Sequence, residues 1–94
     1  MNQPLYSPAA LKDLEEILNY IARDKPNAAI AWVEKIEAKC MLLAASPDIG
    51  EAMPQLGLDV RASCVGNYLI FYRRIGLRIE VLRVIRGDRE ITAL

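Results

Sequence analysis

The spacing of apolar residues changes near Pro47, and this change limits the chain to folds that combine helices with a sheet. Before this point, apolar residues between Leu11 and Leu43 recur every three or four positions, as on one face of an α-helix. The pair Ser7-Pro8 suits the start of a helix, so we predict one helix to about residue 23. A second helix is predicted from Pro26 to about residue 45. The short connection makes the two helices an antiparallel hairpin.

Beyond this hairpin the sequence is typical of short β-strands. Residues 47–59 contain two prolines and two glycines and are predicted to form a loop. Strands are predicted at 60–65, 67–73 and 77–86, with turns at Gly66 and at residues 74–76, and residues 3–6 are expected to add a further strand. We therefore predict a single domain over residues 1–94 of the α+β class. An N-terminal helical hairpin would pack on one face of a small twisted antiparallel β-sheet.

The two faces of this sheet are both apolar, which suggests that one of them binds a partner. If Leu77 pairs with Arg73, the helices cover the face of Leu69, Phe71, Ile79, Val81 and Ile85. The other face, left exposed, would carry Tyr68, Ile70, Tyr72, Leu82, Val84 and Arg86. Bare apolar patches of this kind mark interaction surfaces, although the segment 90–94 or a second copy of the chain are alternative occupants. Arg83 falls on the helix-covered face in this register and would need an acid such as Asp13 or Glu16.

Arginines concentrate in the second half of a chain whose formal net charge is zero. Seven of the eight lie between Arg61 and Arg89, a segment whose acids are Glu80 and Asp88. Arginine suits planar, bidentate recognition of carboxylates and phosphates, so the segment indicates an anionic partner, with a merely solvated face as the alternative. Direct binding to nucleic acid is disfavoured, because a pI near 6.2 gives little long-range attraction to phosphate.

The absence of histidine restricts the chemistry available to this chain. It removes the commonest general base and most zinc and iron sites, so we expect no metal and no cofactor. Cys40 and Cys64 are separate and lie in apolar patterns, which favours reduced thiols over a disulfide. No apolar run approaches the roughly 20 residues of a membrane span, and no signal peptide is visible. We therefore expect a cytoplasmic protein without a membrane partner.

Motifs spread over nearly the whole chain follow a recognisable order: ALKDLEEI in the first helix, SPDIGEAMP after the second, GNYLIFYR at 66–73 and LRVIRGDRE at 82–90. Together they resemble the ParE branch of the RelE/ParE toxins of bacterial type II toxin-antitoxin modules. The last motif often reads LRVLHGARD in that family, so Arg86 stands where many members have histidine. A role of that histidine does not carry over to this chain.

The resemblance implies a small toxin held inactive by an antitoxin, but the family has two kinds of activity. RelE-like members cut ribosome-bound mRNA, whereas ParE-like members block DNA gyrase. The positions of the RelE-like catalytic set hold Asp59, Arg61, Tyr68 and Arg89 here, and its C-terminal tyrosine has no counterpart. Arginine is a poor general base and Asp59 repels phosphate, so the residues favour a protein-binding inhibitor over an enzyme.

Our hypothesis is thus a toxin that a ParD-like antitoxin neutralises and that inhibits DNA gyrase, without catalytic residues and without contacting DNA except through the antitoxin. The alternatives are a RelE-like mRNA endonuclease, a non-toxic antitoxin-binding homologue and, for the exposed face, a homodimer. Coupled folding of a disordered antitoxin segment fits a small domain with an uncovered apolar face. The residues expected to bind the antitoxin are Arg61, Tyr68, Ile70, Leu82, Val84, Arg86 and Arg89.

Overall fold

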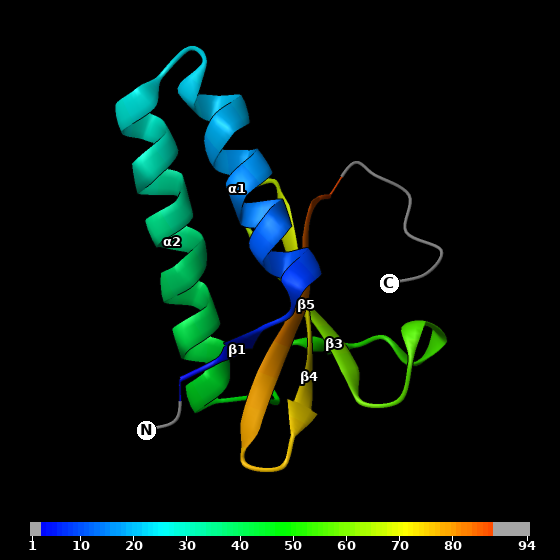
Figure 1. Ribbon diagram of the computed structural model, residues 1–94. Coiled ribbons are helices and arrows are strands. Elements are labelled where there is room, and N and C mark those ends of the chain that lie inside the picture. The colour runs from blue at the N-terminus through cyan, green and yellow to red at the C-terminus, as the bar shows by residue number, and fades with distance from the viewer. Residues whose placement is uncertain (1–2, 88–94) are drawn as a thin grey trace.

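The computed structural model describes residues 3–87 and packs two helices against one face of a five-stranded sheet (Figure 1). This confirms the α+β fold with a helical hairpin on a sheet. The turn between the helices and the turn between β4 and β5 lie at opposite ends of the molecule. The elements, in chain order, are β1 (Leu5–Tyr6), α1 (Pro8–Ala22), α2 (Pro26–Ala45), β2 (Glu51–Ala52), the 3-10 helix η1 (Pro54–Leu56), β3 (Val60–Val65), β4 (Tyr68–Ile75) and β5 (Arg78–Arg86).

Local signals place the helix ends where the sequence predicted them. The Ser7 hydroxyl accepts a hydrogen bond from the Ala10 amide at 3.0 Å, and Pro8 opens α1. This N-cap satisfies one of the amide groups that a helix leaves unpaired at its start. Pro26 opens α2, and that helix ends before Ser46-Pro47.

The sheet is mixed rather than purely antiparallel. Its strand order is β1-β5-β4-β3-β2. β1 pairs in parallel with β5, through Leu5 with Glu80 and Tyr6 with Val81, while the other pairs are antiparallel. The predicted strand at residues 3–6 therefore exists, although it is shorter than expected. The predicted loop at 47–59 contains the short β2 and η1.

The expected pairing of Leu77 with Arg73 is wrong by three positions. Ile75 pairs with Arg78, because a tight turn at Gly76 and Leu77 closes the hairpin and Gly76 takes the left-handed backbone conformation with φ 58°. A second irregularity follows at Leu82, where the partner of β4 changes from Val81 to Arg83 between consecutive residues. This β-bulge places Val81 and Val84 on one face.

These two irregularities change which side chains share a face: Ile79 and Val81 lie on the helix-covered face as predicted, but the β4 residues on that face are those predicted to be exposed. The helix-covered core contains Tyr68, Ile70, Tyr72 and Val84, together with Ile79, Val81 and helix residues such as Ile36 and Leu43. Its apolar side chains are the main source of stability, at about 1.5–3 kcal/mol for each large one. The opposite face of the sheet carries Phe71 and Ile85, and both are also buried in this structure.

α1 covers the part of β5 that the short β1 does not reach. The Ser7 hydroxyl donates to the Leu82 carbonyl at 2.8 Å, and the Asp13 carboxylate accepts from the Val84 amide at 2.9 Å. Asp13 also accepts from Nε and Nη2 of Arg83 at 2.7 and 3.0 Å. The predicted acidic partner of Arg83 is therefore confirmed as Asp13, but the predicted placement is wrong, because Arg83 pairs with Phe71 on the face opposite the helix-covered core. This bidentate bond raises the pKa of Arg83 above its usual range.

Candidate functional site

The exposed apolar face predicted from the sequence does not exist as such. Ile70 is fully buried, Val84 is 2% exposed and Tyr68 is 8% exposed, all beneath the helices. Leu82 is half-buried at the bulge. The error comes from the register, because a shift by three residues puts Tyr68, Ile70 and Tyr72 on the same face as Ile79 and Val81, which the helices cover.

Tyr68 is held in the core by an aromatic contact with α2. Its ring lies 5.8 Å from the ring of Trp32 at an interplanar angle of 64°, an edge-to-face arrangement. Trp32 also lies against Gly66, where a Cβ would clash with the indole, and Gly66 has φ 56°. Tyr68, which the resemblance matches to a cation of RelE-like members, is therefore a packed aromatic side chain in this fold.

A groove runs between α1 and the end of β5. Its base is formed by apolar parts of Ile17, Tyr68, Val84 and Ile85, and its volume is about 430 Å³. Its polar lining carries charges of both signs: the buried Asp13 lies beside the exposed ring of Tyr20 on the rim, and the other polar residues are Glu16, Asn19, Arg23 and Arg86. An apolar floor with a polar rim is the usual anatomy of a protein-binding site.

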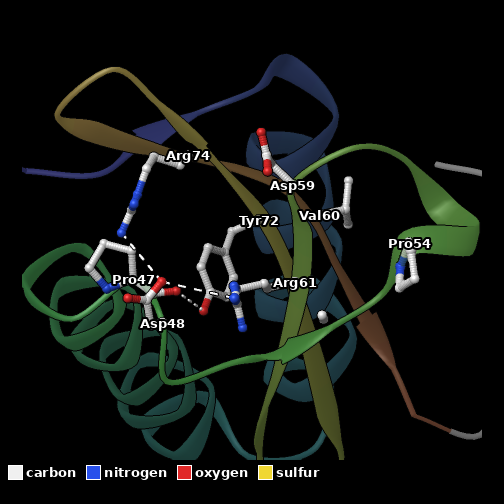
Figure 2. A pocket seen from close by; sticks show the side chains of 9 residues that line it. Pro47, Asp48, Pro54, Asp59, Val60, Arg61, Tyr72 and Arg74 are labelled. Atoms are coloured by element: carbon white, nitrogen blue, oxygen red, sulfur yellow. Dashed lines mark hydrogen bonds and ion pairs between the residues drawn. The ribbon is translucent and has the colours of Figure 1, made fainter.

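A second pocket lies on the helix-covered face of the sheet, beyond the end of α2 (Figure 2). Arg61 of β3 pairs across the sheet with Tyr72 of β4, and Arg74 follows two residues later on the same face. Both guanidinium groups approach one carboxylate oxygen of Asp48, Arg74 Nη2 at 3.4 Å and Arg61 Nη2 at 3.9 Å. The pocket has a volume of about 240 Å³.

Tyr72 connects this pocket to the loop that follows α2. Its hydroxyl donates to the Pro47 carbonyl at 2.8 Å and accepts from the Gly50 amide at 2.9 Å. The Gly50 carbonyl in turn accepts from Arg61 Nη1 at 2.7 Å. Burial raises the pKa of Tyr72 above its usual range, against the opposing effects of the Gly50 hydrogen bond and the Arg61 charge. The hydroxyl therefore stays protonated and holds the loop in place.

The residues predicted to bind an antitoxin are divided between these two places. Tyr68 and Val84 contribute to the base of the groove and Arg86 to its rim, whereas Arg61 lines the pocket. Ile70 lies in the core, Leu82 lies at the bulge, and Arg89 lies outside the described residues.

Sequence reasoning missed the convergence of Asp48 and Arg74 on Arg61. Neither Asp48 nor Arg74 is among the residues that the sequence predicts to bind a partner. The signal in the sequence is the SPDIG motif of the loop, whose Gly50 fits against Tyr72: a Cβ at Gly50 would clash with the hydroxyl oxygen.

The part of the chain that the structure describes shows neither a metal-binding cluster nor a membrane-spanning helix. Residues 3–87 contain no cluster of three or more acidic, cysteine or histidine side chains that could hold a metal ion. None of their helices is both long and apolar enough to cross a bilayer. Cys40 is buried and Cys64 is exposed, and neither forms a disulfide.

Comparison with known proteins identifies the family. The family model described as the ParE toxin of the type II toxin-antitoxin system parDE matches residues 5–91. Toxin ParE1 of Caulobacter vibrioides is 29% identical over 88 residues, which cover 93% of this chain and 91% of that protein. A solved chromosomal ParDE system from P. aeruginosa has the same fold, with a TM-score of 0.79, 22% identity, and coverage of 94% of this chain and 98% of that one. The chain therefore belongs to the family of ParE toxins of type II toxin-antitoxin systems.

Proposed function

We propose that this chain is a toxin that a ParD-type antitoxin neutralises by binding in the groove between α1 and β5. The observation that carries the proposal is the groove itself, with its apolar base and its rim of Glu16, Arg23 and Arg86. A segment of alternating apolar and charged residues fits such a surface as a helix or an extended strand. The relative of known structure is part of a ParDE system, which supports a partner of the ParD type.

The groove is tested at Tyr20, an exposed side chain on its rim. Tyr20→Arg places a long charged side chain over the apolar base, and we expect it to weaken binding of the antitoxin encoded beside the toxin by about tenfold or more. Calorimetry with the purified pair measures this change. Ile30→Arg is the matched control, because Ile30 is similarly exposed on α2 and is not among the groove residues. Equal affinities of the two variants would contradict the proposed groove.

For the free toxin, we propose inhibition of DNA gyrase by protein binding. Membership of the ParE family supports this target. The burial of Tyr68 against Trp32 also supports it, since RNA cleavage by RelE-like relatives uses a cation at the corresponding place. Inhibition of this kind requires only that gyrase contacts the surface of the toxin, and no chemical group is transferred.

Two assays run in parallel test the target. Purified toxin is added to a gyrase supercoiling reaction and to a ribosome-dependent mRNA cleavage reaction, each with and without antitoxin. We expect loss of supercoiling that the antitoxin reverses, and intact mRNA. Cleavage with unaffected gyrase would assign the chain to the endonuclease activity instead, and no effect in either assay would contradict toxicity.

A further inference from the structure

We propose that the pocket between Arg61 and Arg74 binds a carboxylate from an acidic segment of a protein partner, and that Asp48 occupies this position in the free chain. Two guanidinium groups from neighbouring strands point at one place, as Figure 2 shows, and Asp48 Oδ1 lies between them. Arginine presents its donors in a planar fork that matches a carboxylate. The chain thus already holds the kind of group that the site recognises.

Asp48 is held loosely enough to be displaced. Its distances of 3.4 and 3.9 Å exceed the 2.7–2.9 Å that is typical of a close charge-assisted hydrogen bond. The Asp48 side chain is 80% exposed, and ion pairs in such positions contribute little free energy. A carboxylate that enters the pocket with better geometry gains more from the same arginines than Asp48 does.

Arg61 and the loop after α2 are fixed before any ligand binds. Arg61 Nη1 is anchored by the Gly50 carbonyl at 2.7 Å, which leaves the remaining guanidinium donors directed toward the pocket. Tyr72, which is almost fully buried, holds the loop at both Pro47 and Gly50. A partner therefore has to order few groups here, which lowers the entropic cost of binding.

The charges around the pocket favour a carboxylate of a protein over a nucleic-acid backbone. The lining contains Asp48 and Asp59 beside the two arginines, so its formal charge is balanced. A polyanion would bring neighbouring phosphates close to these two acids, and the chain as a whole carries no positive excess to attract it. A single carboxylate that replaces Asp48 between the arginines avoids both costs.

The test uses two short probe peptides, Ac-Ala-Glu-Glu-Ala-NH2 and its neutral counterpart Ac-Ala-Gln-Gln-Ala-NH2, titrated into the toxin at low ionic strength. NMR shifts of the Gly50 amide and the arginine Nε–H groups report on the pocket. We expect the acidic peptide to shift them and the neutral peptide to leave them unchanged. Asp48→Asn removes the internal competitor, so it should tighten binding by about two- to fivefold. Equal binding of the two peptides would overturn the proposal.

Two arginine variants locate the site. Arg74→Gln should weaken binding of the acidic peptide by at least about threefold, because it removes one of the two cations. Arg73→Gln is the matched control: it is the adjacent exposed arginine, lies on the other face and pairs with Glu80. Equal losses in both variants would mean nonspecific attraction. Tighter binding of inorganic phosphate than of the peptide would assign the pocket to phosphate and overturn the proposal. The peptides need no antitoxin or gyrase, so the result is independent of the proposed function.

Discussion

Two groups of charged residues on the sheet use the same chemistry with opposite consequences. At the edge of β5, Asp13 is 8% exposed and accepts three close hydrogen bonds, two from Arg83 and one from the Val84 amide. At the end of α2, the exposed Asp48 makes only long contacts with Arg61 and Arg74. The first group pairs with the part of β5 that β1 does not reach, and it belongs to the fold. The second leaves two oriented arginines available to another molecule.

The largest expected effect comes from breaking the buried group. Asp13→Ala removes the acceptor of Arg83 and leaves the Val84 amide without its partner, so the free energy of unfolding should fall by about 3–5 kcal/mol. Urea titration followed by circular dichroism measures the change. Glu15→Ala, at an exposed position of the same helix, is the control and should change stability by less than about 0.5 kcal/mol. A loss below about 1 kcal/mol for Asp13→Ala would show that this group does not hold the edge of β5.

A second test uses the pH dependence of stability to compare the buried Cys40 with the exposed Cys64. Burial raises the pKa of Cys40 to about 11, from a usual value near 9, and burial also raises the pKa of Tyr6 beside it. Between pH 9 and 11 the Cys40 thiol of the unfolded chain releases a proton that the folded chain retains. The free energy of unfolding therefore falls as pH rises from about 9 to 11, by roughly 2 kcal/mol. Urea titrations at pH 8, 9.5 and 11 measure the slope.

Variants at the two cysteines assign that slope. Cys64→Ser should leave the decrease unchanged, because Cys64 is exposed. Cys40→Ala lowers stability at every pH but should reduce the decrease. A slope that is the same in both variants would show that neither thiol causes it.

A smaller effect is expected where the fold supports the pocket. Tyr72→Phe removes the hydroxyl that bonds Pro47 and Gly50, and the free energy of unfolding should fall by about 1–2 kcal/mol because the Gly50 amide loses its acceptor. Thermal and urea unfolding measure this loss. Tyr20→Phe is the matched control, since that ring is 60% exposed. Similar stabilities of the two variants would mean that the loop is held by other contacts.

The smallest effect is expected in the open group itself. Asp48→Asn should change the free energy of unfolding by less than about 0.5 kcal/mol, because exposed ion pairs with long contacts contribute little. The same urea titration that detects the loss in Asp13→Ala serves as the measurement. A loss above about 1 kcal/mol would place Asp48 among the residues that hold the fold and would remove the contrast between the two groups.

Sequence predicted the elements of this fold better than their register. Ser7, Pro8 and Pro26 act within one helical turn, so their effect on helix ends is readable from the sequence. In contrast, β5 has adjacent apolar residues at Val81-Leu82 and at Val84-Ile85, so alternation cannot choose which face is buried. The tight turn at Gly76 and the bulge at Leu82 made that choice.

For the candidate sites too, the sequence predicted single residues better than the contacts that depend on the pairing of the strands. The sequence predicts an acidic partner for Arg83, and Asp13 is that partner. Arg61 lines the pocket, and its role in binding stays a prediction. The pocket could not be predicted, because Asp48 meets Arg61 and Arg74 only through the path of the loop after α2 and the pairing of β3 with β4. The groove depends in turn on the bulge that turns Val84 toward α1.

The position of β5 within the sheet has a consequence for synthesis on the ribosome. It is the last strand of the described chain, yet it lies between β1 and β4 and packs against both helices. A nascent chain therefore exposes the apolar faces of α1 and α2 until the residues up to Arg86 have been translated. Products of premature termination before Arg78 lack β5, the strand that pairs with both β1 and β4. We expect such products to be removed by proteases rather than to act as toxins.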